Sequence, residues 1–418
     1  MPTVPRTSKK RVIIAGAIGN VMEWYDFAIY GYFASVIGKL FFPSEDPAVS
    51  LIAAFGAFAA GFLVRPIGGI VFGRIGDMVG RKRALMLSVL AMAVPTVLIG
   101  VLPTYASIGF AAPVLIVLLR MVQGLAVGGE YTTSVVFLVD HAPPGGRAFT
   151  SVWGQWGAVV GILFGSLVGS MVVDFLPVEA FESWGWRVPF LLGGLVAVVG
   201  MLLRRQLHTD VPPAEKTSPL RDTFGLHRMD VLRVILLNIG PGVTFYAAFV
   251  YAVSYMKTID KLPTGIAFNN NTEAMAVILV LLPISAWLAD RIGRKPMLIA
   301  GSAFVALGAM PLMNLMHSTD PSTVFLGELG FAFGFALMGG AVVVNVELMP
   351  RIVRCTGLAF AYNLAVGVFG GTTPLVATAL IQSTGDPTSP AWWIAGAAAI
   401  TLVTTILWVP ETRDRALD

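Results

Sequence analysis

The sequence predicts an all-α membrane protein with twelve transmembrane helices, and three observations lead to that prediction. First, 56% of the 418 residues are hydrophobic and only 12% are charged, whereas roughly a quarter of the residues of a soluble domain are charged. Second, the mean hydropathy is +0.79. Third, the chain contains twelve apolar runs, each of about 20 residues, the length that crosses a bilayer core of about 30 Å.

Each apolar run is expected to form one helix, because continuous runs differ from the alternating pattern of barrel strands. The first run carries two acids and lacks an obvious small-residue cleavage site, so it is interpreted as an uncleaved span. The single cysteine, Cys355, excludes an internal disulfide. The runs begin near Val12, Leu51, Ala84, Ala111, Val152, Val188, Val231, Thr272, Met297, Val324, Thr356 and Ala391.

The basic residues predict the orientation in the membrane. One side receives little beyond Lys39, Lys257 and Lys261, whereas the other side receives most of the Lys and Arg residues. By the positive-inside rule the rich side is cytoplasmic. We therefore expect a multi-pass protein of the bacterial inner membrane with both termini in the cytoplasm. The residues of the rich side are Arg6, Lys9, Lys10, Arg11, Arg74, Arg81, Lys82, Arg83, Arg204, Arg205, Lys216, Arg221, Arg228, Arg291, Arg294, Lys295, Arg351, Arg354, Arg413 and Arg415.

Repeated motifs divide the chain into two halves. GDMVGRKRAL (76–85) recurs as ADRIGRKPML (289–298), in both cases after the second span of a six-span block. VDHAPPGGRA (139–148) recurs as VELMPRIVRC (346–355), and each copy joins an acid to an arginine seven residues later. The predicted parts are an N-terminal six-helix bundle (1–203), a cytoplasmic linker (204–230) and a C-terminal six-helix bundle (231–418).

Two carboxylates occupy the otherwise apolar first span. Glu23 and Asp26 share a helix face with Asn20 and Tyr30, and this face is expected to point into a cavity between the bundles. An unpaired charge at mid-bilayer costs several kcal/mol, so such acids are normally paired or mark a proton pathway. The expected partner is Arg120 in the fourth span, since Asp26 and Arg120 lie roughly 9 Å and roughly 12 Å below the outer surface. The alternative is a permanent structural ion pair.

Arg65 is the other cation expected inside the membrane, roughly 12 Å from the inner face. Its guanidinium group matches the geometry of a carboxylate, so it is a natural ligand for an organic anion. The alternative is a snorkelling or gating residue near the inner rim. If both acids were protonated, Arg65 and Arg120 would be uncompensated, which favours a dianion or a tricarboxylate carrying one proton.

Four motifs resemble a known family. They are GNVMEWYDFAIYG (19–31), RPIGGIVFGRIGD (65–77), RMVQGLAVGGE (120–130) and SWGWRVPF (183–190). Together with the two halves, they resemble the metabolite:proton symporter family of the major facilitator superfamily, whose two bundles rock about a central substrate site. Met78 departs from the family pattern, which often has arginine at this position. The segments most similar to the citrate and tricarboxylate members are TFYAAFVY (244–251) and GGTTPLVATALIQSTGDPTSPAWW (370–393).

The resemblance implies a proton-coupled importer of a small organic acid, a di- or tricarboxylate such as citrate, that works by alternating access. It associates Glu23, Asp26 and Arg120 with proton coupling. Gln155 and Asn363 are the preferred pocket residues, because helices 5 and 11 line the cavity in this superfamily. The full candidate substrate site is Arg65, Arg120, Tyr30, Gln123, Gln155, Asn238, Tyr246, Asn345 and Asn363.

The inner loops are expected to form a cytoplasmic gate. Exposed ion pairs are individually worth about 1 kcal/mol or less, so such pairs can break when substrate is released. Two further acids, Glu130 and Glu328, have no predicted role. The candidate gate residues are Asp77, Arg81, Asp140, Arg147, Asp290, Arg294, Glu347 and Arg354.

Two other functions remain as alternatives. Trp153 and Trp156 can cage a quaternary amine, so the runner-up is a proton symporter of a zwitterionic osmolyte such as betaine or proline. The third possibility is a membrane sensor that does not transport.

An enzyme is not expected, because the sequence has no Ser/His/Asp order, no metal-ligand cluster and no Gly-rich phosphate loop after a strand. We expect no cofactor, no metal and no nucleic-acid partner. The expected partners are an organic anion, protons and the lipid bilayer, and the expected functional unit is a monomer.

Overall fold

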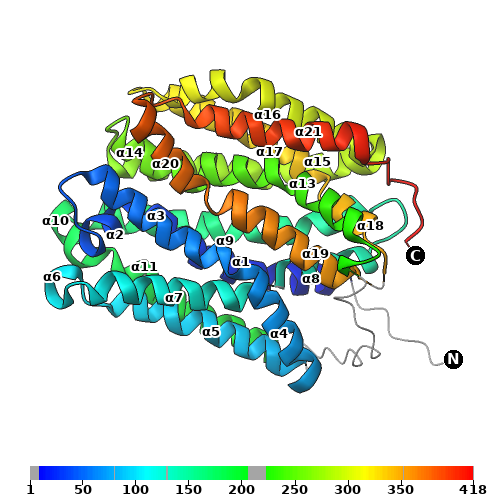
Figure 1. Cartoon of the computed structure of the whole chain (residues 1–418), viewed down its shortest axis with the longest axis horizontal. Coiled ribbons are helices and arrows are strands. Elements are labelled where there is room, and N and C mark those ends of the chain that lie inside the picture. The colour runs from blue at the N-terminus through cyan, green and yellow to red at the C-terminus, as the bar shows by residue number, and fades with distance from the viewer. Residues whose placement is uncertain (1–8, 80, 129, 206–222, 352, 418) are drawn as a thin grey trace.

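The computed structural model describes residues 9–79, 81–128, 130–205, 223–351 and 353–417. Within these ranges the chain forms helices and their connections, without a strand. The long helices run side by side along the long axis of the molecule, and short helices lie at its ends (Figure 1). The predicted all-α fold class is confirmed.

Six helical passes form the N-terminal half. Two of them, the second and the fourth, are divided into two labelled helices each, and short helices connect other passes. In chain order the elements are α1 (Lys9–Tyr32), α2 (Ala34–Phe41), α3 (Pro47–Leu63), α4 (Arg65–Val79), α5 (Arg81–Val101), α6 (Tyr105–Ile108), α7 (Ala111–Val127), α8 (Glu130–Asp140), α9 (Arg147–Phe175), α10 (Val178–Ala180), η1 (Phe181–Gly185) and α11 (Arg187–Arg205).

Six further passes form the C-terminal half. The first and the fifth of them contain a π-helical segment, a feature that is frequent at functional sites. The elements are α13 (Arg228–Phe245), η2 (Tyr246–Tyr251), α14 (Ala252–Thr258), α15 (Thr264–Ile292), α16 (Arg294–Met316), α17 (Pro321–Gly340), α18 (Val344–Leu348), α19 (Arg354–Leu364), η3 (Ala365–Gly370), α20 (Thr373–Thr384) and α21 (Pro390–Trp408).

Length and apolarity identify most passes as membrane spans. In the described part of the chain nine helices are long and apolar enough to cross a membrane. The apolar parts of α5 and α11, Leu87–Val101 and Arg187–Val196, are shorter. The remaining pass is α1, which carries the two acids of the first span. The molecule is therefore a multi-pass membrane protein with twelve passes, as predicted.

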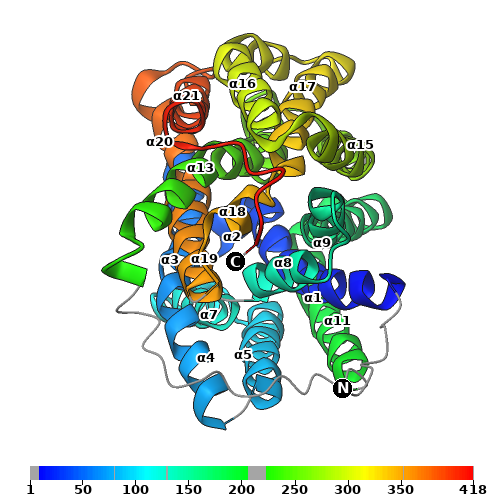
Figure 2. The ribbon, with the colours of Figure 1, turned by 90° about the vertical axis from the view of Figure 1, so that its right-hand side faces the viewer.

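The two halves lie on opposite sides of a central region when the molecule is viewed end-on (Figure 2). They meet where α9 packs against α15 and where α3 packs against η3 and α20. Both bundles extend into the linker expected at 204–230, because α11 continues to Arg205 and α13 begins at Arg228. Residues 206–222 of that linker lie outside the described ones.

The two ends of the molecule differ in charge. At one end the first residues of α9, α16 and α19, which are Arg147, Arg294 and Arg354, gather with the C-terminal segment. We call this the arginine-rich end. The opposite end carries α2, α6 and α10 (Figure 1), and there Lys39 pairs with Glu182. We call it the arginine-poor end.

Glycines allow the N-terminal helices to touch backbone to backbone. A Cβ atom on Gly161 in α9 would lie 2.2 Å from the carbonyl oxygen of Val21 in α1. One on Gly124 in α7 would lie 1.7 Å from the carbonyl oxygen of Gly61 in α3. Side chains larger than hydrogen do not fit at such distances, and small residues have this role at many membrane helix interfaces. These contacts hold α1 against α9 and α3 against α7.

One helix begins much earlier than predicted. The apolar pattern places the start of the eighth span near Thr272, whereas α15 begins at Thr264. The intervening residues include Asn269, Asn270 and Asn271. Their amides form hydrogen bonds with Ser170, the backbone of Pro321 and Tyr32. Because neighbouring helices satisfy these polar groups, the helix extends through a stretch that hydropathy does not recognise.

Candidate functional site

Glu23 on α1 is paired with Arg65 at the start of α4, and the two side chains are 3% and 2% exposed. Arg65 lies at a break in the second pass, where Pro66 has no N–H group to continue the helix from α3. The guanidinium carbon of Arg65 is 4.8 Å from the ring centres of Phe27 and Phe62. Arg65 is thus a buried partner of Glu23 in this structure.

Asp26, one turn further along α1, is 2% exposed and is held by three side chains from two other helices. It accepts hydrogen bonds from the Thr96 hydroxyl on α5 and from the Gln123 amide on α7, the latter at 2.7 Å. Nη1 of Arg120 lies 3.8 Å from its carboxylate and donates to Oε1 of Gln123 at 2.8 Å. Gln123 therefore links the acid to the predicted arginine.

Phe27 separates the two ion pairs. The guanidinium carbons of Arg65 and Arg120 lie 4.8 Å and 4.7 Å from its ring centre. Arg120 also lies 4.5 Å from the ring centre of Tyr30. Cation–π attraction favours these positions. Two acids and two arginines thus form one buried network with no net formal charge when all four are ionised, and a proton on either acid would leave it positive.

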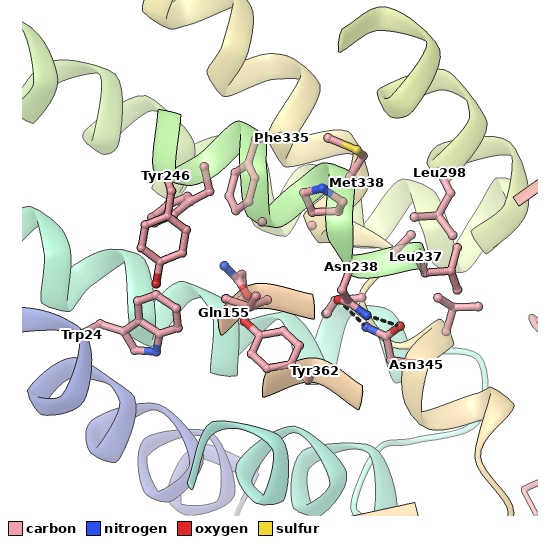
Figure 3. Close-up of a pocket in the computed structure, with 18 residues that line it drawn as sticks. Trp24, Gln155, Leu237, Asn238, Tyr246, Leu298, Phe335, Met338, Asn345 and Tyr362 are labelled. Atoms are coloured by element: carbon pink, nitrogen blue, oxygen red, sulfur yellow. Dashed lines mark hydrogen bonds between the residues drawn. The ribbon is translucent and has the colours of Figure 1, made fainter. Parts of the chain in front are cut away.

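A cavity of about 40 Å³ lies between the bundles, next to this network (Figure 3). The residues that line it include aromatic rings and neutral amides, and none of them is charged. Trp24 contributes from α1, Gln155 from α9, Tyr246 from η2, and Tyr362 from α19. Both halves of the molecule therefore contribute to the wall. The other polar or aromatic lining residues are Asn238, Phe245, Phe335 and Asn345.

The polar groups of the cavity fall into two sets. Asn238 and Asn345 donate to each other's side-chain oxygens, both at 3.1 Å (Figure 3). In contrast, Nε1 of Trp24 and the hydroxyl of Tyr246 are buried and have no hydrogen-bond partner among the described residues. The ring centres of Trp24 and Tyr246 are 6.4 Å apart. Two donors beside the cavity are therefore available to a ligand.

The acids of α1 do not line the cavity, which corrects the prediction for their helix face. Asn20 donates to Oγ of Ser134 and to the carbonyl of Gly154, and Tyr30 donates to the carbonyl of Ala54. The shared face therefore points into the N-terminal bundle, because its charges are compensated there by Arg65 and Arg120. Trp24, one position after Glu23, lies on the cavity side instead.

Several other predicted pocket residues also lie away from the cavity. Arg65, Arg120, Tyr30 and Gln123 belong to the buried network. Asn363 donates to the carbonyl of Gly128 and so joins the two halves. Trp153 and Trp156 have ring centres 5.4 Å apart but are not lining residues. Gln155, Asn238, Tyr246 and Asn345 are the predicted residues that do line the cavity.

Six of the predicted gate residues meet at the arginine-rich end, in pairs within the C-terminal half and in pairs that join the two halves. Glu347 accepts from Arg294 at 3.1 Å and 3.2 Å and lies 3.5 Å from Arg147. Asp140 lies 3.5 Å from Arg354. The acid of each motif is thus paired with the arginine of the other motif, which lies in the other half. Asp290 also accepts from the backbone N–H groups of Ala148 and Phe149. The side chains of Asp77 and Arg81 lie outside the described residues.

The C-terminal segment crosses the arginine-rich end (Figure 2). The Thr412 hydroxyl donates to Glu347 at 2.6 Å, and Arg147 donates to the carbonyl of Arg415 at 2.7 Å. Burial alone would raise the pKa of Glu411, but hydrogen bonds from backbone N–H groups, that of Arg294 foremost, hold the pKa below its usual value. The segment therefore adds contacts between the two halves at this end.

The arginine-poor end is also closed. The Asn271 amide donates to the Tyr32 hydroxyl at 2.9 Å, and the hydroxyls of Ser166 and Thr272 are 2.7 Å apart. Gln382 donates to Asp46 at 3.0 Å. Each of these contacts joins the two halves. With hydrogen bonds across both ends, the structure represents a closed state around the central cavity.

Two kinds of residue at the candidate site were not predicted from the sequence. Thr96 is a threonine in an apolar span, where no motif distinguishes it from a packing residue. Trp24 and Phe335 read as ordinary apolar residues, although the position after Glu23 faces about 100° further around the helix. Because Glu23 pairs with Arg65 inside the N-terminal bundle, the next residue, Trp24, faces the cavity.

Comparison with protein families gives one match. The family model described as "Sugar (and other) transporter" matches residues 12–209 and 211–418, which is nearly the whole chain. Its members are transporters rather than enzymes.

Relatives with named substrates fall into two groups. The chain is 33% identical to a glycine betaine/proline/ectoine/pipecolic acid transporter of Dickeya dadantii, over 98% of this chain and 84% of the relative. It is 34% identical to a citrate–proton symporter of Salmonella typhi, over 97% of this chain and 95% of the relative. The two names cover both substrate classes that the sequence left as alternatives.

Solved structures agree on the fold. A crystal structure of a D-xylose–proton symporter superposes with a TM-score of 0.78 at 18% identity, covering 98% of this chain and 100% of that one. At this identity the similarity establishes the architecture of two six-helix bundles and nothing finer. The chain belongs to the family of sugar and other transporters and has the fold of the major facilitator superfamily.

Proposed function

We propose that this protein is a proton-coupled symporter that imports a small zwitterion, such as a betaine or an imino acid, by alternating access. The observation that carries the proposal is the chemistry of the central cavity: aromatic rings, neutral amides and two unpartnered donors, with no charged side chain among the lining residues. A zwitterion needs no net counter-charge, so a neutral cavity suits it.

The two ends of such a substrate have matching groups. The rings of Trp24, Phe245, Tyr246 and Tyr362 offer electron-rich faces to a quaternary or secondary ammonium group. Nε1 of Trp24 and the hydroxyl of Tyr246 offer hydrogen bonds to a carboxylate. Buried donors without partners cost free energy, on the order of 1–3 kcal/mol each. Substrate binding would remove that cost.

Proton coupling is assigned to the buried network of Glu23, Asp26 and Arg120, with Arg65. Trp24 connects it to the cavity, because its ring contacts that of Tyr246 and lies 5.7 Å from the guanidinium carbon of Arg65. A proton on Glu23 would weaken its pairing with Arg65. The arginine would then be free to move, and the wall of the cavity with it.

Alternating access follows from the contacts at the two ends. We propose that the arginine-rich end is cytoplasmic, in the inner membrane of a bacterium, and that the pairs of Asp140, Arg147, Glu347 and Arg354 break when substrate is released inward. The side chain of Asp140 is half exposed, whereas that of Glu347 is buried, so opening this end must bring water to Glu347 as its pairs break.

An organic acid such as citrate is the second candidate. The supporting observation is the position of Arg65, whose guanidinium carbon lies 5.7 Å from the ring centre of Trp24. Once Glu23 were protonated, Arg65 could pair with a carboxylate of the substrate instead. The citrate–proton symporter of Salmonella typhi is 34% identical to this chain.

Uptake into liposomes tests these functions. Purified protein is reconstituted, an inward proton gradient is imposed, and labelled betaine, proline, citrate and succinate are supplied in parallel. We expect accumulation of betaine or proline, and collapse of the gradient with an ionophore should abolish it. Accumulation of citrate alone would replace the zwitterion by the second candidate. Binding without any flux would instead support a sensor.

A further inference from the structure

Glu328 in the first half of α17 is fully buried, with 0% of its surface exposed. Neither of its carboxyl oxygens has a hydrogen-bond partner among the described residues. No lysine, arginine or histidine among these residues forms an ion pair with Glu328. Glu23 and Asp26, by contrast, each have an arginine. Burying an ionised carboxylate without a partner costs several kcal/mol. The closed structure avoids this cost only if Glu328 carries a proton.

Among the described residues, no positive charge compensates Glu328. Tyr32 on α1 and Glu273 on α15 are the titratable side chains that act on it electrostatically. The other described elements that pack extensively against α17 are α16, α13, η2 and α9. None of their charged groups is among those that act on Glu328. Glu273 is an exposed acid, so its charge opposes ionisation of Glu328.

Glu328 also lies near the contact that closes the arginine-poor end. Tyr32, within electrostatic range of Glu328, accepts the hydrogen bond from Asn271 on α15. The Oδ1 atom of Asn271 is a second buried acceptor without a partner in the described part of the chain. A protonated carboxyl group would supply a donor to a region that has unpartnered acceptors. Separation of α15 from α1 and α9 would expose the same region to water.

We propose that Glu328 is a second proton-binding site, in the C-terminal bundle, and that the arginine-poor end closes only after Glu328 takes up a proton. With that end open, the ionised carboxylate is hydrated. Closure would bury it without a partner, so a proton must pass from water to the carboxyl group first. This inference deepens the proposed proton coupling and rests on alternating access, but it does not depend on which substrate is carried.

The distance across the arginine-poor end tests the proposal. Glu45 and Ser383 are exposed and lie next to Asp46 and Gln382, whose hydrogen bond joins the halves. Spin labels are attached to cysteines at these positions in a Cys355→Ser background. The distance between the labels is measured in lipid nanodiscs without substrate, from about pH 5 to about pH 9. This range includes the raised pKa values that buried carboxyl groups commonly have.

We expect the labels to move apart as the pH rises in the wild-type background. In Glu328→Gln, which keeps the shape but cannot ionise, the shift should be lost and the end should stay closed at every pH. Glu328→Asp should retain a shift, which separates loss of the proton from a folding defect. Glu273→Gln on the facing helix keeps Glu328, so it should retain the shift, but at lower pH, because a charge that opposes ionisation of Glu328 is removed.

Two results would overturn the proposal. One is a wild-type distance that does not change with pH, and the other is a Glu328→Gln variant that opens with pH as the wild type does. The measurement is independent of the uptake assay. If the arginine-poor end closes as the pH falls but none of the solutes accumulates, the result would count against the proposed substrate and not against Glu328.

Discussion

The two bundles repeat one architecture but differ in how they hold buried polar groups. The N-terminal bundle pairs Glu23 with Arg65 and Asp26 with Arg120. The C-terminal bundle places the neutral pair Asn238 and Asn345 at the cavity. It pairs Glu347 with Arg294 at the arginine-rich end but leaves the buried Glu328 without a partner among the described residues. Symmetry of the backbone therefore does not extend to the chemistry.

This difference suggests different effects of a proton in the two bundles. In the N-terminal bundle a proton would break an existing ion pair and release an arginine. In the C-terminal bundle a proton would remove an uncompensated charge from Glu328 and allow burial. Two proton sites with opposite local effects can act at different steps of one transport cycle.

The largest expected effect comes from leaving one partner of a buried pair alone. In Arg120→Leu, Asp26 keeps its charge but loses its cation, and breaking a buried pair in this way costs about 3–5 kcal/mol. Thermal unfolding in detergent should show the loss. The double variant Asp26→Asn with Arg120→Leu should recover most of the stability without recovering accumulation. A single variant as stable as the wild type would mean that the pair is not buried in the membrane.

A smaller structural change with a large functional effect is expected for Asp26→Asn. Its amide can keep hydrogen bonds with Thr96 and Gln123 while losing the charge. We expect gradient-driven accumulation to disappear, whereas exchange of labelled for unlabelled substrate continues. Uptake and counterflow in the same liposomes measure both. Normal accumulation by this variant would transfer the proton role to Glu23.

Moderate effects are expected at the neutral cavity. Tyr246→Phe and Trp24→Phe each remove one donor and keep most of the ring. A net hydrogen bond is worth about 1 kcal/mol, so substrate affinity should fall roughly fivefold in each variant, as measured by the concentration dependence of uptake. Tyr105→Phe, at an exposed tyrosine of the arginine-poor end, is the control. An unchanged affinity in both cavity variants would remove the donors from the substrate site.

The smallest effect is expected outside the membrane. Burial raises the pKa of Asp260 to about 6, although the hydrogen bond from His317 acts in the opposite direction. Because the folded value is raised, the contribution of Asp260 to stability is complete below about pH 4 and is lost as the pH rises through about 6. Asp260→Asn should remove this dependence, with a change in melting temperature of about 2 °C. The same pH profile in both proteins would exclude Asp260 as its source.

Much of the fold could be predicted because span length and motif repetition are local properties of the sequence. The late start predicted for α15 shows the limit, since Asn269 to Asn271 are satisfied by residues far away in the chain. The ion pairs of the gate show the same limit. Asp140 and Arg147 are close in sequence, but each pairs with the other half in space.

The candidate site was predictable only in part. Depth along a helix brought Asp26 and Arg120 together correctly, because rise per residue is nearly constant. The direction of the α1 face was wrong, since nothing in one sequence says which side of a helix faces a cavity. The partner of Glu23 depended on a break at Pro66 that aims Arg65 inward. Trp24 was not predicted to line the cavity, because the sequence does not show which face of α1 points there.

The central claim is that acids of α1 exchange protons in step with transport through an uncharged cavity. The most direct test is the proton-to-substrate ratio, obtained from the membrane potential at which net flux reverses in liposomes. We predict at least one proton per zwitterion in the wild type and none in the double variant Glu23→Gln with Asp26→Asn. A wild-type ratio of zero, or an unchanged ratio in the double variant, would contradict the account.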